Sequence, residues 1–310
     1  MFVEAYDAKS ILTPTGGFLA GARPGSGYTH TLNPAIGCPY GRGFCGQFCY
    51  ARLGLAHTFA RAGDWGDYLR VKRNAADLLR RELDRAARRA PARPDHVGRL
   101  AIFASSSTDP CAGPTRPVFA ACLAVLAEYP IRRIVIQTRA PGVLRLRGPI
   151  EALGKRAVVS LTLETDSDEV WRAGPRGAPD ISTRRRLAEA LREWTTTLHI
   201  AISPCLKLRA PERFADWIAA TGNRATVDTF LAGDGASGAR TARLNLPRLY
   251  AARGWDWREQ DEAQQLFDLL RRRMGPRAGF SAAGFVGLVA DEAEGALHGA
   301  GNSPQRALRT

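Results

Sequence analysis

The stretch His30–Arg52, HTLNPAIGCPYGRGFCGQFCYAR, holds three of the six cysteines of the chain. Cys38, Cys45 and Cys49 are separated by six and by three residues, and most of the intervening residues are glycine, proline or aromatic. Such a composition does not sustain a regular helix or strand, so we expect a loop. Thiolates on one short loop can converge on a metal ion or an iron–sulfur cluster. The stretch therefore predicts a cysteine loop that binds metal.

Short apolar segments alternate with amphipathic helical patterns along most of the chain. Alternation of this kind is typical of a parallel α/β sheet. Six strand–helix units without a long interruption predict a partial (βα)6 TIM-type barrel, with the cysteine loop after its first strand. The predicted strands are residues 28–37, 100–104, 131–138, 157–164, 198–203 and 225–231. The predicted helices between them are residues 70–89, 117–128, 144–153, 182–194 and 211–221.

We expect three regions along the chain. Residues 1–27 are rich in glycine and proline and predict an irregular lead-in. Residues 28–232 form the partial barrel. Residues 233–310 form a C-terminal extension that is mostly helical, with its main helix at 260–273 and a frayed polar end at 301–310.

Composition and length describe an ordinary globular protein. The chain has 310 residues, of which 45% are hydrophobic and 24% charged, enough for a substantial core. No apolar run approaches the roughly 20 residues that span a bilayer, so we expect no membrane association. The first residues, MFVEAYDAKS, do not have the pattern of a signal peptide, which favours the cytoplasm. In that compartment clustered cysteines more often bind metal than form disulfides.

The chain is strongly basic, with 44 Lys and Arg against 30 Asp and Glu and a net charge of +14. Such a charge favours a polyanionic partner such as nucleic acid. A compositional bias is the other explanation, because alanine, arginine and glycine are abundant throughout and runs such as Arg184–Arg186 lie on predicted helices with solvated faces. Charge by itself leaves both explanations open.

Polar residues follow several of the predicted strands. In parallel α/β folds the active site gathers at the carboxyl ends of the strands. Here these ends carry residues 105–109, Thr138, Arg139, Ser160, Thr162, Glu164 and Ser203, and the cysteine loop follows the first strand. The predicted site is therefore a polar rim around the cysteine loop.

Several spaced segments resemble radical S-adenosylmethionine (radical SAM) proteins of the spore photoproduct lyase-like group. The matching segments are NPAIGC at 33–38, CYAR at 49–52, VKRNAADLLRREL at 71–83, SSTDP at 106–110, QTRAPGVLR at 137–145 and SLTLETDSDEVWR at 160–172. The resemblance implies a partial barrel that holds a [4Fe–4S] cluster on three cysteines, with SAM on the open iron. It also implies reductive cleavage of SAM to a 5′-deoxyadenosyl radical, which abstracts hydrogen from an unidentified substrate. Nucleic acid is the leading substrate class, and a ferredoxin or flavodoxin would supply the electron.

The resemblance also assigns roles to individual residues. The cluster ligands are Cys38, Cys45 and Cys49. The SAM-binding residues are Ser106, Asp109, Arg139, Ser160 and Thr162. Of these, Arg139 would bind the SAM carboxylate bidentately, since a guanidinium matches a carboxylate in geometry, and Asp109 would lie near the amino group or the ribose.

The sequence departs from that group in two places. The cysteine spacing is wider than usual, and Arg42 within it cannot bind iron, so a cluster requires all three thiolates; a damaged cluster site or a zinc site is the alternative. In the lyases themselves a cysteine before the second strand's aspartate supplies a hydrogen atom, whereas this chain has Ser105–Ser107 there. The nearest cysteine, Cys111, is a weak catalytic candidate, with a small buried core residue as the alternative.

Two further interpretations remain. The segment Gly233–Gly238 fits the pattern GxGxxG, but no βαβ unit follows it, which favours an ordinary glycine-rich loop over a dinucleotide site.

The alternative to a radical SAM enzyme is a non-catalytic zinc- or cluster-binding protein that binds nucleic acid. A cluster-bearing enzyme that does not use SAM is a third possibility. Metal content and SAM cleavage distinguish them.

Overall fold

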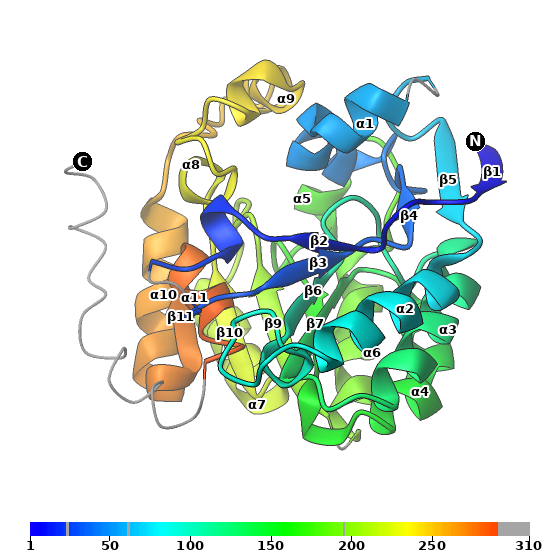
Figure 1. Ribbon diagram of the computed structural model, residues 1–310. Helices are drawn as coiled ribbons and strands as arrows, with labels where there is room; N and C mark the ends of the chain where they lie inside the picture. The colour runs from blue at the N-terminus through cyan, green and yellow to red at the C-terminus, as the bar shows by residue number, and fades with distance from the viewer. Residues whose placement is uncertain (23–24, 61–62, 195, 291–310) are drawn as a thin grey trace.

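The computed structural model describes residues 1–22, 25–60, 63–194 and 196–290. Its main sheet has eight strands in the order β11-β10-β9-β8-β7-β6-β3-β2 (Figure 1). All neighbours pair in parallel except β2 and β3, which are antiparallel. The strands are β2 (Leu12–Pro14), β3 (His30–Leu32), β6 (Ala101–Ala104), β7 (Arg133–Thr138), β8 (Ala157–Thr162), β9 (Thr197–Ile202), β10 (Arg224–Val227) and β11 (Ala278–Phe280).

Helices connect the parallel strands and cover the outer face of the sheet (Figure 1). The longer ones are α2 (Ala75–Ala87), α3 (Thr115–Ala127), α6 (Ile181–Arg192), α7 (Pro211–Thr221) and α10 (Asp261–Met274). Helix α2 packs on α3, α6 on β8 and β9, and α10 on α7 and β10. The shorter ones are α1 (Leu55–Ala60), α4 (Arg147–Glu151), α5 (Asp168–Trp171), α8 (Phe230–Gly233), α9 (Leu246–Ala251) and α11 (Ser281–Val286).

Side chains of the sheet alternate between two apolar layers, as the pleat of a strand requires. Ile102 and Ile134 belong to the main core beneath the outer helices. Their neighbours Phe103 and Val135 point to the opposite face, where they pack with Phe285 of α11. Helix α11 therefore closes the inner face of the sheet, and both faces are buried, as parallel sheets require.

The mixed α/β fold with a parallel sheet confirms the expected α/β class. The first predicted strand, 28–37, is divided between β3 and β4 (Ala35–Ile36). Strand β4 belongs to a separate small sheet with β5 (Tyr68–Lys72) and β1 (Phe2–Tyr6), in the order β1-β5-β4. The expected helix at 70–89 consequently begins only at α2, because its first residues pair with β1 and β4.

The terminal regions contain more strand than the sequence predicts. The lead-in contributes β1 and β2, and the C-terminal extension contributes β11, which pairs in parallel with β10. Both gains come from pairing with distant segments, which a local pattern does not reveal. The polar end at 301–310, expected to be frayed, lies outside the described residues. Among the described residues, no helix combines the length and the apolar character that a membrane span requires.

Candidate active site

A cavity of about 540 Å³ lies at the carboxyl ends of the parallel strands. All three cysteines of the cysteine loop line it, together with residues that immediately follow four of the strands. These are Ser105–Asp109 after β6, Arg139 after β7, Ser203 after β9 and Asp228 after β10. The structure thus brings the cysteine loop and the polar strand ends to one place, where α/β folds carry their active sites.

The cysteine loop is folded by close contacts between glycines. A Cβ atom built on Gly46 would lie 1.7 Å from the carbonyl oxygen of Gly41, and one on Gly43 would lie 2.5 Å from Cα of Gly177. No side chain fits at either position. Gly41 also donates its N–H to the carbonyl oxygen of Cys38 at 2.9 Å. These contacts explain why the segment around the cysteines needs so many glycines, and they hold Cys38 and Cys45 on one compact turn.

Aromatic side chains anchor the same loop to helices α5 and α8. Phe44 packs edge-on against Trp171 of α5 with ring centroids 5.6 Å apart, and against Phe48 at 5.5 Å. Phe48 in turn contacts Phe230 of α8 at 5.7 Å. The loop is therefore fixed on two sides by apolar packing, and the phenylalanines that separate the cysteines in the sequence supply the anchor.

Burial raises the pKa values of the three thiols. The pKa of Cys45 rises to about 12, that of Cys38 rises well above its ordinary value, and that of Cys49 is also raised. Arg139 opposes the shift at Cys45 and Cys49. Protonated thiols are the state expected of this loop without metal, since metal binding displaces these protons. Arg42, the residue within the cysteine spacing, is exposed and pairs with Asp67.

The site fits an iron–sulfur cluster in chemistry, although the side chains are not arranged as a finished metal centre. In the described ranges no group of three or more His, Cys, Asp or Glu side chains has that arrangement. The three thiols nevertheless face one cavity. Two residues of the lining, Trp65 and Thr108, each carry a buried polar atom, Nε1 and Oγ1, that has no hydrogen-bond partner among the described residues. Orphaned donors are rare in native proteins and indicate a missing partner.

Asp109 joins the ends of β6 and β7. Its carboxylate accepts hydrogen bonds from Thr138 Oγ1 at 2.7 Å, from the Arg139 N–H at 2.8 Å and from the Cys111 N–H at 3.0 Å. Burial raises the pKa of this carboxyl, and the hydrogen bonds oppose that shift. Asp109 lines the cavity as predicted, with at least three of its acceptor positions already used by the fold.

Ser106 lies on a turn that Asn33 organises. The Asn33 side-chain oxygen accepts hydrogen bonds from Ser105 Oγ at 2.8 Å, from the Ser106 N–H at 2.8 Å and from the Ser107 N–H at 3.1 Å. This contact connects the end of β3 to the end of β6. Ser106 lines the cavity, as the SAM-binding assignment requires.

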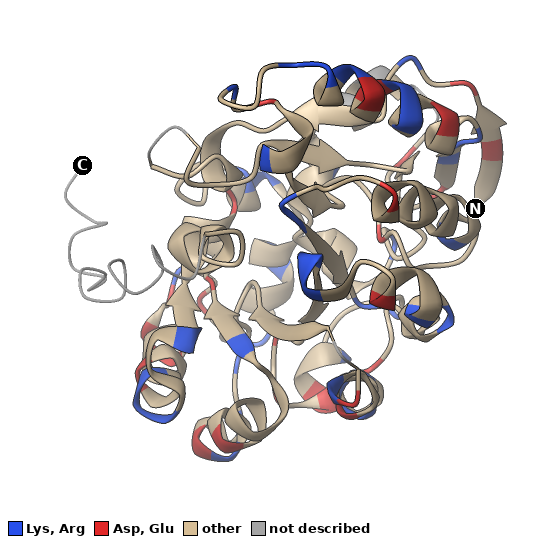
Figure 2. Ribbon diagram, turned by 60° about the horizontal axis from the view of Figure 1, so that its bottom comes forward, with Lys and Arg blue, Asp and Glu red and all other residues tan. Residues whose placement is uncertain are grey.

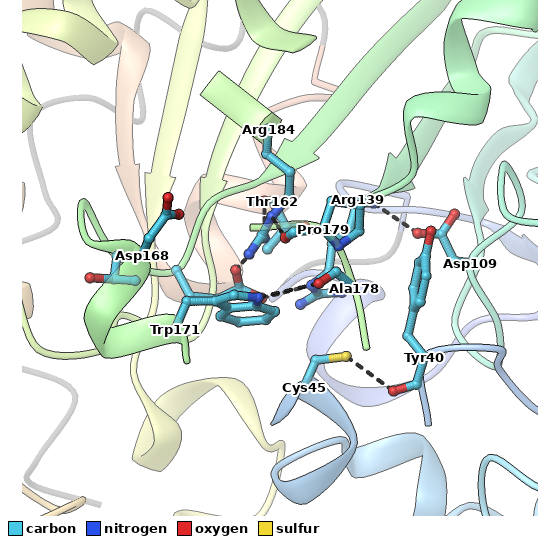
Figure 3. Close-up of polar contacts among 12 residues, drawn as sticks. Tyr40, Cys45, Asp109, Arg139, Thr162, Asp168, Trp171, Ala178, Pro179 and Arg184 are labelled. Atoms are coloured by element: carbon cyan, nitrogen blue, oxygen red, sulfur yellow. Dashed lines mark hydrogen bonds and ion pairs between the residues drawn. The ribbon is translucent and has the colours of Figure 1, made fainter. Parts of the chain in front are cut away.

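Arg139 lines the cavity between Asp109 and Arg184 (Figure 3), and the buried carboxylate of Glu164 holds its side chain. Its Nε donates to Glu164 Oε1 at 2.7 Å, and the other oxygen of Glu164 accepts from Arg184 Nη1 at 2.6 Å. Burial alone would raise the pKa of Glu164, but the two guanidinium groups outweigh it and lower the pKa. Glu164, at the end of the fourth predicted strand, therefore positions the arginine.

Ser160 and Thr162 lie on the inner face of β8 and are not among the residues that line the cavity. Ser160 Oγ contacts His199 Nδ1 at 2.8 Å, and His199 Nε2 contacts Thr226 Oγ1 at 2.8 Å. Thr162 Oγ1 accepts from Gln137 Nε2 at 3.3 Å. Burial lowers the pKa of His199 to about 3, so this chain of hydrogen bonds is neutral. A direct SAM contact from either hydroxyl stays a prediction.

The remaining cysteines lie away from the cavity. Cys111 is fully buried and is not part of the lining, and Cys122 lies in the core of α3. Cys205 follows β9 but faces a separate small pocket, with its Sγ 3.5 Å from the carbonyl oxygen of Leu206. The burial of Cys111 agrees with the interpretation of this residue as part of the core.

The glycine-rich segment at 233–238 is a loop folded around its own aspartate. The Asp234 carboxylate accepts hydrogen bonds from the backbone N–H groups of Ala236, Gly238, Arg240 and Thr241, at 2.7 to 3.0 Å. These are the donors that a phosphate would need in a dinucleotide site. Since a carboxylate of the chain already occupies them, the segment does not act as a phosphate cradle.

Sequence reasoning missed Asp228 and Trp65. Asp228 was placed inside the predicted strand 225–231, whereas β10 ends at Val227 and leaves the carboxylate on the cavity wall. The carboxylate accepts from Ser203 Oγ at 3.2 Å and from the Thr229 N–H at 2.9 Å. Trp65 belongs to a loop without any local pattern. A strand end four residues earlier, at Val227, would have pointed to Asp228; no sequence signal pointed to Trp65.

The Asp228 carboxyl predicts a pH dependence of stability. Burial raises its pKa from 3.8 to about 6. Between these pH values the folded state binds more protons than the unfolded state, so this group lowers the stability as the pH rises through that window. This pKa shift changes the free energy of unfolding by about 3 kcal/mol at most. Relative to wild type, Asp228→Asn is therefore expected to gain stability between pH 4.5 and pH 7.5, measured by urea unfolding at both values. If the free energies of unfolding of wild type and Asp228→Asn differed by the same amount at both pH values, the prediction would be contradicted.

Comparisons with known proteins identify the fold. No protein-family model and no curated protein sequence matches the chain. Among solved structures, a cysteine-to-serine variant of spore photoproduct lyase superposes with a TM-score of 0.60 at 15% identity, covering 90% of this chain and 81% of that one. The lyase complexed with dinucleoside spore photoproduct gives 0.59 at 14% identity over the same shares. A double variant with bound AdoMet and the same dinucleoside gives 0.56 at 15%, over 82% and 76%. The chain therefore has the fold of spore photoproduct lyase, a radical SAM enzyme.

Proposed function

We propose that this protein is a radical SAM enzyme with a partial (βα)6 barrel, in which Cys38, Cys45 and Cys49 hold a [4Fe–4S] cluster. The observation that carries the proposal is that all three cysteines and the polar strand ends line one cavity. The fold of spore photoproduct lyase supports it independently of sequence identity. With SAM bound, the cluster would supply an electron for reductive cleavage and so a radical that abstracts hydrogen.

The residues of the cavity would bind and orient SAM. Arg139 is held by Glu164 through Nε, which leaves its two terminal nitrogens to bind a carboxylate in the cavity. Ser106, on the turn fixed by Asn33, and Thr108 belong to the cavity lining and carry hydroxyl groups. The aromatic wall formed by Phe48 and Phe230 would exclude water from the reacting groups.

A nucleic-acid substrate is the leading proposal. The net charge of +14 and the dinucleoside bound by the structural neighbours support it. Figure 2 shows basic segments spread over several helices with acidic segments beside them, and some of these arginines form surface ion pairs, for example Arg80 with Glu128. Part of the charge is therefore neutralised locally, and the substrate would be recognised mainly in the cavity rather than by one basic face.

Reversal of a DNA lesion with a cysteine hydrogen donor is not the reaction we propose. Such a donor has to reach the substrate radical, and Cys111 is fully buried outside the lining. Apart from the three proposed ligands, no cysteine lines the cavity in the described part of the chain. The hydrogen abstraction would lead to a different product.

We also propose a cytoplasmic location and a ferredoxin or flavodoxin as electron donor. All six cysteines are free thiols in the structure. Free thiols are the usual state of cysteines in a reducing compartment, where low-potential electron carriers are available.

The decisive experiment is anaerobic reconstitution with iron and sulfide, followed by dithionite, SAM and an assay for 5′-deoxyadenosine. We expect about four irons per chain and SAM cleavage in wild type, with both lost in Cys38→Ala, Cys45→Ala and Cys49→Ala. Cys205→Ala removes a thiol outside the cavity and is expected to retain both. Bound zinc without a cluster would overturn the proposal and favour a non-catalytic metal-binding protein. A complete cluster without SAM cleavage would overturn its enzymatic part.

A further inference from the structure

We propose that an exposed arginine segment beside the cavity binds the phosphates of a nucleic-acid strand while one nucleotide of that strand occupies the cavity. The arginine segment spans residues 240–258, and its arginines are Arg240, Arg243, Arg248, Arg253 and Arg258. The inference rests on the proposed function and deepens it, since it assigns the substrate a binding surface next to the reacting groups.

The fold does not neutralise the charge of the arginine segment. All five arginine side chains are exposed, and none of them forms an ion pair within the described ranges. The segment has one acidic residue, Asp256, whose carboxylate accepts the backbone N–H of Arg258 at 2.9 Å. By contrast, Arg273 on α10 pairs with both Glu212 and Asp216. A basic surface without carboxylate partners attracts a polyanion.

Arg240 connects the arginine segment to the cavity. It is exposed and lines the cavity together with Thr241. Its Nη1 donates to the carbonyl oxygen of Asp234 at 2.9 Å, and its backbone N–H donates to the Asp234 carboxylate at 3.0 Å. Farther along, Asn245 Nδ2 donates to Gln47 Oε1 of the cysteine loop at 3.0 Å. The segment is therefore fixed beside the cavity, and the Arg240 guanidinium is held by a neutral carbonyl group.

Aromatic packing holds the rest of the arginine segment, whose helix α9 lies at the same end of the sheet as α1 (Figure 1). Trp257 is buried and contacts Phe230 of α8, with ring centroids 6.5 Å apart. The guanidinium carbons of Arg258 and Arg253 lie 4.5 Å from the ring centroid of Trp257 and 6.0 Å from that of Trp255. The tryptophans thus support the arginines from below, and the charges project from a folded base.

Two features favour a nucleic-acid strand over an acidic protein. The arginine segment contains no lysine, and a guanidinium group binds a phosphate bidentately. Tyr50 lines the same cavity and is 41% exposed, and an exposed aromatic ring in a basic surrounding can stack on a base. A nucleotide reaches such a cavity from a single strand or after leaving a duplex, so the test uses a single strand.

The test measures the binding of a fluorescein-labelled single-stranded DNA of about ten nucleotides and mixed sequence by fluorescence anisotropy. The full chain is titrated at salt concentrations between about 50 and 200 mM. In the triple variant Arg240→Gln, Arg243→Gln and Arg248→Gln we expect the affinity at the lowest salt to fall roughly tenfold or more. The slope of log K against log salt becomes shallower by about 2, because each phosphate contact to a single strand contributes about 0.7.

The matched control removes three exposed arginines that do not line the cavity, on α2 and directly after it, by Arg81→Gln, Arg85→Gln and Arg88→Gln. We expect this variant to keep the slope and the affinity of wild type. Equal losses in the two variants, or no binding by wild type at the lowest salt, would overturn the inference. Labelled polyglutamate of the same length is expected to bind wild type at least about tenfold more weakly than the DNA. Equal affinities for the two polyanions would overturn the assignment to nucleic acid.

A second measurement covers the case in which the triple variant of the arginine segment does not fold. Wild type is photocrosslinked to the same DNA carrying 5-iodouracil, and the modified peptides are identified by mass spectrometry. We expect crosslinks within residues 240–258, and crosslinks found only elsewhere would overturn the inference. Iron content and SAM cleavage are measured on the same preparation. A wild type that binds DNA through the arginine segment but assembles no cluster would overturn the proposed function and support this surface.

Discussion

Replacement of Arg184 by alanine is expected to lower the free energy of unfolding by about 3–5 kcal/mol, the usual cost of removing one partner of a buried ion pair. Arg184 and Glu164 have completely buried side chains, and their closest atoms are 2.6 Å apart. Arg184 also donates to the carbonyl oxygens of Thr162 and Pro179 and stacks over Trp171 at 4.2 Å (Figure 3). Its removal leaves a buried carboxylate with Arg139 as its remaining ionic partner.

Urea unfolding of wild type and Arg184→Ala measures the loss directly. The matched control is Arg209→Ala, because Arg209 pairs with Glu169 at 2.8 Å but both side chains are more than half exposed. An exposed pair contributes less than about 1 kcal/mol. Equal and small losses in the two variants would show that the buried pair does not hold the strand ends together.

Gly46→Ala is expected to abolish cluster assembly without touching a cysteine. The new Cβ atom would lie 1.7 Å from the carbonyl oxygen of Gly41, and backbone atoms cannot rotate away as a flexible side chain can. The turn that begins at Cys38 and the segment around Cys45 would have to separate. Overpacking of this kind costs about 1–3 kcal/mol, so we expect a folded protein whose iron content after reconstitution is far below that of wild type.

Iron content and urea unfolding together measure this effect. Gly148→Ala is the matched control, since nothing lies within 4 Å of a Cβ atom at Gly148 in helix α4. We expect the control to bind iron like wild type and to change the stability by less than about 1 kcal/mol. A Gly46→Ala protein with full iron content would mean that the close contact between the two glycines is not required for the metal site.

The sequence predicted most of the sheet and missed the parts built by distant pairing. Five of the six expected strands correspond to single strands of the main sheet, since runs such as 131–138 are apolar and β-branched. Strand β11 has only three residues, one of them glycine, and exists because β10 offers it a free edge. Strand β5 was read as the start of a helix, because its pairing partner β1 lies more than sixty residues away.

For the candidate site, local patterns identified residues better than they identified contacts. Arg139, Asp109 and the three cysteines line the cavity as expected from their places after strands and in the loop. Ser160 is different, because the pleat turns it to the inner face of β8 and His199 from the neighbouring strand engages its hydroxyl. Which partner a polar group meets depends on the neighbouring strand, which the sequence of one strand does not specify.

The sequence by itself determined the parallel α/β class and the place of the cysteine loop. Both depend on hydrophobic periodicity and on glycine and proline positions, which are properties of neighbouring residues. Only the tertiary structure decided that Glu164 holds Arg139, that Asp228 reaches the cavity, and that Trp65 rests on Gly41 with its N–H unpaired. These contacts join segments far apart in the chain, and they form only when the sheet has closed around its core and excluded the water that would otherwise satisfy each polar group.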